Sequence, residues 1–326
     1  MTYNRRGRPF RASRIYWFNL ARQLDGNMDK GPRYGSYCLT QRRVMAGWGC
    51  VAEWRWPQPR KPVVWPPNEP PGLDRIARFN RTRAHFRIRS VSDAKVCLWR
   101  AGPFGFSVPI TGQWRIAPNG VIALPRDRGE FEDLGHAVTA VQYDDRTRLF
   151  KFINSWGPDW GEGGMGYLPY EYFDAYVSDA WFESPMKLGH WLPVPTPERF
   201  AKEVRSFVNA LNHLCVAIDL WDTIDDIRIG WCFMTFRDGY LDVEDYFLRP
   251  GFHGTDHQVQ LARSVSDVVS QQDLPLRVWV AHADYHPNAT NVENVRDFLR
   301  STGITVRRSP HTWAAYVGET QLSYIK

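Results

Sequence analysis

The sequence predicts an α+β protein with two parts, residues 1–187 and 188–326. Three observations support this fold class. Apolar residues recur at helical spacing near the N-terminus, and from Ala84 they alternate with polar residues as in strands. The net charge changes sign between the parts, from +10 before the boundary to −4 after it. A chain of 326 residues also fits about two domains.

The first part is expected to combine a helical lobe with an antiparallel β lobe. Apolar spacing predicts a buried helix over 13–24 and a shorter helix over 42–50 that ends at Gly47 or Gly49. Seven prolines in the nineteen residues 54–72 require an extended segment. Later strands are predicted over 85–91, 105–110, 121–125, 136–143 and 149–156, with a short helix over 91–102.

The second part is predicted to be mixed α/β. It follows a predicted linker over 185–199, which contains four prolines. A helix is predicted over 197–215, because a proline starts it and apolar residues follow at helical spacing. Asp238-Gly239 is a hairpin signal between strands over 227–239 and 240–250. The remaining predicted elements are a helix over 256–272, a strand over 276–283, a helix over 291–303 and strands over 304–309 and 313–318.

Composition excludes several classes of protein. No apolar run approaches the roughly 18 residues of a spanning helix, so no membrane partner is expected. The first residues contain no apolar h-region, so they do not form a secretory signal. The five cysteines form no C-x-x-C pair, which argues against a zinc site, and no metal is predicted. Their odd number predicts reduced, mostly buried thiols and a cytoplasmic location.

Six arginines are concentrated between Arg75 and Arg89. One interpretation is a nucleic-acid patch. The favoured interpretation is one solvated face of a strand, so nucleic acid is not the expected partner.

His136 and Asn154 lie on neighbouring predicted strands that a short turn at 144–146 joins. An Asn oxygen that accepts from an imidazole N–H fixes the tautomer and leaves the other ring nitrogen free as a base. That is the base and orienter of a Cys/His/Asn catalytic site. Trp156 would shield the bond from water, and five nearby glycines would let the loop turn tightly. A histidine that only packs in the core is the alternative.

The combined string "GHAVTAVQYDD…LFKFINSWGPDWGEGGMGYLPYEYF" resembles the His–Asn region of papain-family cysteine peptidases. The matches are "GHAV" at 135–138, "NSWG" at 154–157, "WG" at 160–161 and "GY" at 166–167, with Gln142 as a departure. The resemblance implies that His136 is the general base and Asn154 its orienter, in a peptidase that needs no cofactor.

Cys38 is the first candidate for the nucleophile, because "GSYC" is similar to the family's Gly-Ser-Cys. However, His136 follows it by only 98 residues, whereas about 130–150 are expected. "RASRIYWFNLARQLDG" and "GWGCVAEWRWP" resemble segments that follow the nucleophile's helix in bacterial papain-like enzymes. We therefore expect an N-terminally truncated domain, or a start codon upstream of Met1.

The expected consequence is a hydrolase domain without its catalytic cysteine, inactive as it stands. The missing helix should expose apolar residues from Ile15 to Leu24, which a protein partner would cover. The alternative is a pseudoenzyme that binds peptides or proteins in the residual cleft.

In the second part, "GYLDVEDYFLRPGFHGTDHQVQLARSV" resembles the core of a GNAT-type N-acetyltransferase. Leu248, His253 and Gly254 fall at the positions implied for acetyl-CoA binding. However, His253 replaces an Arg, and Asp256 and Gln258 replace glycines. A carboxylate repels pyrophosphate, so a GNAT-like fold that serves packing or partner contact is favoured over an acyltransferase.

Overall fold

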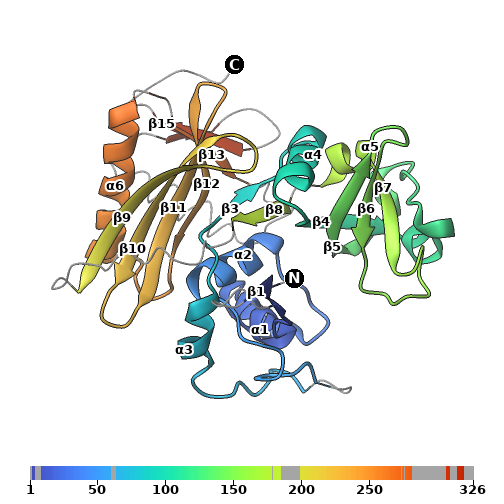
Figure 1. The fold of residues 1–326 in the computed structure, drawn as a ribbon, viewed down its shortest axis with the longest axis horizontal. Coiled ribbons are helices and arrows are strands. Elements are labelled where there is room, and N and C mark those ends of the chain that lie inside the picture. The colour runs from blue at the N-terminus through green and yellow to red at the C-terminus, as the bar shows by residue number, and fades with distance from the viewer. Residues whose placement is uncertain are drawn as a thin grey trace.

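The computed structural model describes residues 2–3, 9–59, 64–177, 179–184, 199–272, 274, 276–280, 306–308 and 314–318. Figure 1 shows three groups of elements within them: a helical group, a six-stranded sheet and a seven-stranded sheet with one long helix on its outer face. The predicted linker over 185–199, apart from Arg199, and the predicted helix over 291–303 lie outside the described residues. Within those residues, the fold is the mixed α+β class that the sequence predicts.

The helical group consists of α1 (Arg14–Leu24), α2 (Cys38–Gly47) and α3 (Leu73–Ala77). The Ser13 hydroxyl accepts from the Tyr16 N–H and donates to the Trp56 carbonyl, which fixes where α1 begins. The prediction that the apolar residues of α1 are exposed is wrong. Ile15 is 3% and Leu20 is 7% exposed, because α2, α3 and the segment around Trp56 cover them.

Short elements precede α1 or lie between the longer helices and strands. They are β1 (Thr2–Tyr3), β2 (Pro9–Phe10) and the 3-10 turns Met28–Lys30, Arg78–Asn80, Gly112–Ile116, Pro118–Gly120 and Arg128–Glu130.

The six-stranded sheet has the order β3-β8-β4-β5-β6-β7, and every neighbouring pair is antiparallel. Its elements are β3 (Ala84–Arg87), α4 (Val91–Arg100), β4 (Phe104–Thr111), β5 (Phe131–Asp144), β6 (Leu149–Ile153), β7 (Met165–Pro169), α5 (Tyr170–Tyr176) and β8 (Asp179–Ser184). The strand predicted over 121–125 is wrong. Only Val121 forms a bridge, to Tyr167, and Pro125 offers no N–H to extend the ladder.

The seven-stranded sheet has the order β14-β15-β13-β12-β11-β10-β9. Its elements are β9 (Phe200–Val208), β10 (Leu214–Asp222), β11 (Ile227–Arg237), β12 (Tyr240–Leu248), α6 (Asp256–Gln272), β13 (Leu276–Val280), β14 (Val306–Arg308) and β15 (Ala314–Gly318). Only the β12–β13 pair is parallel. The predicted hairpin is confirmed, and Asp238 and Gly239 both have positive φ, 53° and 80°.

The helix predicted over 197–215 is wrong, because this segment forms β9 and the start of β10. Lys202, Val204, Ser206 and Val208 are exposed, whereas Glu203, Arg205 and Phe207 are partly buried. This alternation has the period of two that a strand requires.

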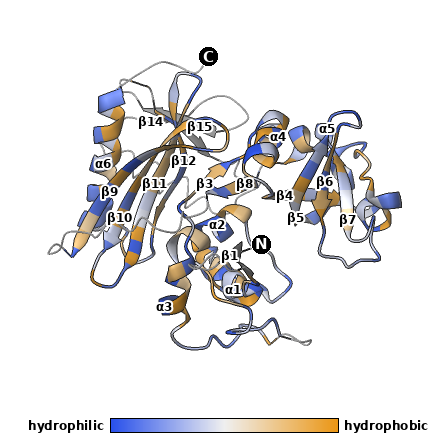
Figure 2. Cartoon of the chain, in the orientation of Figure 1, coloured by the Kyte–Doolittle hydropathy of each residue, from blue (hydrophilic) through white to orange (hydrophobic). Residues whose placement is uncertain are grey.

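Both faces of the seven-stranded sheet are covered. α6 packs one face through Leu261, Val265 and Val268, and Figure 2 shows this helix with hydrophobic and hydrophilic sides. The opposite face joins the first part of the chain, where Trp231 and Phe233 belong to the same buried cluster as residues of the six-stranded sheet. The two sheets therefore share one core.

Buried ion pairs cross this junction. Asp245 on β12 accepts from Arg43 Nη2 at 2.7 Å, from His85 Nε2 at 2.8 Å and from Trp231 Nε1 at 2.9 Å. Arg89 pairs with Asp242 and Glu244 on the same strand. The interpretation of the arginine run as a solvated strand face is therefore wrong for Arg89, which faces the second sheet.

Candidate active site

The β5–β6 pair brings the two predicted site residues together. His136 lies near the start of β5, and Asn154 follows directly after β6. The imidazole Nε2 lies 2.7 Å from Asn154 Oδ1. The Ser155 N–H donates to the same oxygen at 2.7 Å, so the amide orientation is well defined. An oxygen at this position requires the proton on Nε2 and leaves Nδ1 unprotonated.

Aromatic rings enclose this bond. The Trp156 ring centroid lies 4.7 Å from that of His136, at an angle of 30°. Trp114 contacts the imidazole edge-on at 6.3 Å, and its carbonyl accepts from Trp160 Nε1 at 2.8 Å. Asn154 is buried. These rings therefore largely keep water from the hydrogen bond between His136 and Asn154.

The surroundings of His136 favour its neutral form. Burial lowers the pKa of the imidazole, the hydrogen bond to Asn154 opposes this shift, and the nearby Arg115 charge adds to the lowering. Arg115 is held beside the ring by an ion pair with Glu132 at 2.8 Å. A neutral imidazole with a free Nδ1 is the state that a general base needs.

Glycines shape the loop that follows. A Cβ at Gly166 would lie 2.4 Å from the Phe152 ring and 2.6 Å from the Trp160 ring. Gly164 has a φ of 86°, and its carbonyl accepts from the Asn154 N–H at 2.9 Å. The loop thus ties the backbone of Asn154 in place, and larger residues at these two positions would disturb it.

Cys38 does not join this pair. It is 3% exposed at the first position of α2. Its N–H donates to Asp179 Oδ2 at 2.8 Å, and the Ser107 hydroxyl donates to the same oxygen at 3.2 Å. Ser107 is paired with Asp179, whereas the next residue of β4 is paired with His136. Neighbouring residues of a strand point to opposite faces, so Cys38 and His136 lie on opposite faces of the sheet.

The environment of Cys38 also disfavours a thiolate. Burial raises the pKa of the thiol, and the Asp179 carboxylate raises it further. The remaining four cysteines are fully buried, with thiol pKa values that burial also raises. The prediction that most cysteines are small buried residues is confirmed.

The candidate cofactor residues surround the turn between β12 and α6. Leu248 is buried under α6, while His253 and Gly254 are exposed. The Gly254 N–H donates to Gln258 Oε1 at 2.7 Å. A side chain of the helix therefore occupies a backbone donor that a bound pyrophosphate would need.

Trp114 and Arg115 are site residues that sequence reasoning missed. Both lie on a 3-10 turn more than twenty residues before His136, where no periodic pattern links them to β5. No cluster of three or more metal-ligating side chains occurs among the described residues. The helices in the described part of the chain are too short or too polar to cross a bilayer.

No protein-family model matches the chain. A curated relative, the uncharacterized peptidase C1-like protein L477 of Acanthamoeba polyphaga mimivirus, is 26% identical over 184 residues. The match covers 53% of this chain and 58% of that relative. Among solved structures, xylellain, a cysteine protease from Xylella fastidiosa, is 26% identical with a TM-score of 0.50. That match covers 56% of this chain and 73% of xylellain.

Proposed function

From the homology to papain-like cysteine peptidases over about half of the chain, we propose that His136 and Asn154 form the base and orienter of a cysteine-peptidase site. The 2.7 Å contact between His136 Nε2 and Asn154 Oδ1 carries this proposal. In the reaction, a thiol loses its proton to Nδ1 and its sulfur attacks the peptide carbonyl carbon. The imidazolium then returns the proton to the leaving amine.

We further propose that none of the five cysteines in this sequence is the nucleophile. All five are buried, and Cys38 lies on the sheet face opposite to His136. The raised thiol pKa values keep them protonated at neutral pH. On this proposal the 326 residues do not hydrolyse peptide bonds by themselves.

The alternative is a peptide-binding pseudopeptidase. It is favoured by an apolar side chain that is exposed on the same turn as Trp114 and Arg115: Ile116 is 70% exposed. An extended peptide could place one of its own apolar side chains against this residue.

Activity and labelling measurements test the proposal. The purified chain is incubated with fluorogenic peptides at neutral pH, and separately with an epoxysuccinyl inhibitor followed by mass spectrometry. We expect no turnover and no modified cysteine. Turnover that His136→Ala abolishes, together with labelling that Cys38→Ala removes, would contradict our placement of the nucleophile. Peptide-induced shifts of the Trp156 indole resonance without turnover would support the pseudopeptidase.

For the second part of the chain we propose a GNAT-like unit that does not use acetyl-CoA. Support for the likeness comes from β12, the turn, α6 and β13, which follow in the order strand, loop, helix and parallel strand. The Gly254–Gln258 bond and the Asp256 carboxylate oppose pyrophosphate binding. Calorimetric titration with acetyl-CoA should therefore give no saturable heat at micromolar concentrations, and a saturable isotherm would overturn this view.

A further inference from the structure

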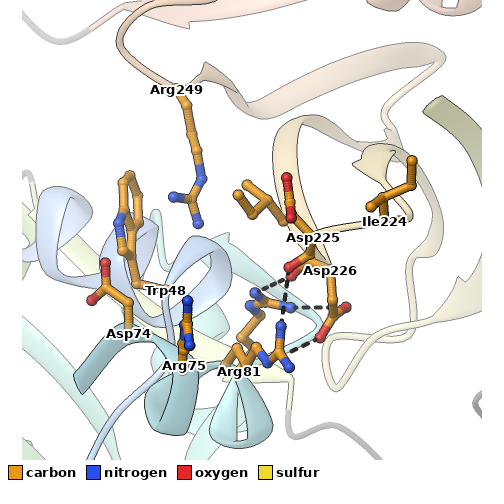
Figure 3. A pocket seen from close by; sticks show the side chains of 10 residues that line it. Trp48, Asp74, Arg75, Arg81, Ile224, Asp225, Asp226 and Arg249 are labelled. Atoms are coloured by element: carbon orange, nitrogen blue, oxygen red, sulfur yellow. Dashed lines mark hydrogen bonds and ion pairs between the residues drawn. The ribbon is translucent and has the colours of Figure 1, made fainter. Parts of the chain in front are cut away.

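A cavity of about 420 Å³ lies between the helical group and the seven-stranded sheet, remote from His136 in the sequence and in the fold. Figure 3 shows Arg75 and Arg81 on one side, Arg249 and Trp48 on another, and Asp226 opposite. Arg78 completes a set of four arginines in the lining. Small-molecule sites have volumes of roughly 300–1,000 Å³, so this cavity is large enough for more than an inorganic ion.

The carboxylates in the lining are already engaged. Asp226 lies 3.6 Å from Arg78 and 3.5 Å from Arg81. Asp225 is paired with Arg199 at 3.3 Å, outside the cavity lining. Asp74 accepts from the Tyr16 hydroxyl at 2.8 Å. The lining holds four arginines against three aspartates, so it carries a formal excess of one positive charge.

Two of the arginines have no carboxylate within ion-pair distance among the described residues. Arg249 donates only to carbonyls, from Nε to Arg228 at 2.8 Å and from Nη2 to Gly47 at 2.7 Å. Its guanidinium lies 3.9 Å from the Trp48 ring centroid, which fixes its orientation. Arg75 is exposed at the cavity and forms no ion pair with a described residue.

Buried donors in the same lining have only a distant acceptor. Nε of Arg78 and Nη1 of Arg81 are buried, make no hydrogen bond, and lie 3.6 Å and 3.5 Å from the Asp226 carboxylate. Unsatisfied buried donors are costly, and donors on a cation are the costliest. Burial is the largest cause that lowers the pKa of Arg249 to about 10, and repulsion from the neighbouring Arg81 charge adds to it. An anion in the cavity would relieve both costs.

We propose that this arginine pocket binds a small oxyanion ligand, one that carries a phosphate or carboxylate group held by Arg75, Arg78 and Arg249. Guanidinium groups match both oxyanions with paired hydrogen bonds. A nucleic-acid strand is not the favoured ligand, because Arg89 from the same arginine run is paired with Asp242 and Glu244 of the second sheet. Because Arg75 and Arg78 belong to the first part and Arg249 to the second, the ligand would also fasten the two parts together.

Calorimetric titration of the full chain with pyrophosphate and with citrate, at constant ionic strength, tests the pocket. We expect saturable binding of at least one of them, and which anion binds identifies the group. Arg75→Gln should weaken binding roughly tenfold without a change in melting temperature, because one charge-assisted hydrogen bond is lost. Arg249→Lys should weaken binding as well, because lysine keeps the positive charge but cannot donate two parallel hydrogen bonds as the planar guanidinium does.

Arg126→Gln is the matched control, because Arg126 is an exposed arginine outside the lining. It should bind like the unmodified chain. Absence of saturable heat with both anions would overturn the proposal, and so would binding that neither Arg75→Gln nor Arg249→Lys weakens. Calorimetry is preferred to a thermal shift alone, since phosphate stabilises many proteins through exclusion from the surface.

Discussion

His136 is held by groups from different segments of the six-stranded sheet. Asn154 fixes its tautomer, Trp114 and Trp156 bury it, and Arg115 adds a positive charge at its side. Burial and the Arg115 charge disfavour the imidazolium, whereas the hydrogen bond to Asn154 favours it. The neutral state of the imidazole is therefore a property of the folded surroundings.

Replacing Arg115 should raise the pKa of His136 toward the usual value of about 6.5. Arg115→Gln removes a positive charge that disfavours imidazolium, whereas burial, the larger cause, remains. A histidine-resolved NMR titration measures the shift, with Arg126→Gln as the control. A His136 that titrates at or above the usual value in the unmodified chain would contradict the assignment.

The lowered pKa of His136 also determines how its contribution to the free energy of unfolding changes with pH. The pKa of His136 is lower in the folded chain than in the unfolded one, so the unfolded state binds more protons between the two values. This contribution to stability is fully present above about pH 6.5. It is lost as the pH falls through the folded pKa.

Sequence reasoning reached His136, Asn154 and Trp156 because they lie within 21 residues of one another on strands that a short turn joins. Local pairing then determines their geometry. Trp114 and Arg115 could not be predicted from the sequence, because their contact with His136 depends on how a distant 3-10 turn packs against the sheet.

At the scale of elements, the N-terminus of α2 has a structural role, because a buried carboxylate caps it. Asp179 accepts the N–H groups of Cys38 and Leu39 at 2.8 Å and 3.2 Å. A carboxylate at this end interacts favourably with the helix dipole. The position that could stabilise a thiolate therefore holds a fixed carboxylate, which supports the proposal that Cys38 is not the nucleophile.

The β9 segment shows why one element was predicted wrongly and another correctly. β9 is an edge strand with Val204 and Val208 exposed, so its apolar residues do not mark a buried face and mimic helical spacing. By contrast, α6 has a single buried side, and the predicted bounds 256–272 match the structure. Helical periodicity is informative when one side is buried.

At the scale of the whole molecule, the junction between the sheets was not predictable. Arg43 and Asp245 are 202 residues apart, and His85 and Asp245 are 160 apart. Each is a charged or polar residue in a segment whose local pattern gives no sign of a partner. Only the assembled fold shows that these side chains are buried together.

Asp245→Ala should destabilise the chain by about 3–5 kcal/mol, because Arg43 would remain buried without a counter-charge. Denaturant unfolding followed by fluorescence measures this change. Asp159→Ala, at an exposed loop position, is the control and should stay within about 0.5 kcal/mol. A loss below about 1 kcal/mol for Asp245→Ala would show that the pair contributes little.

The shared core has a consequence for biosynthesis. A Cβ at Gly47 would lie 3.2 Å from the Trp231 ring, so the end of α2 packs directly against a strand that is translated much later. At about 5–20 residues per second, the ribosome needs roughly ten seconds or more to add that strand. Until then, the face of the nascent chain around Gly47 and Phe86 has no covering. Chaperone binding during translation should therefore persist until β11 and β12 have emerged from the exit tunnel.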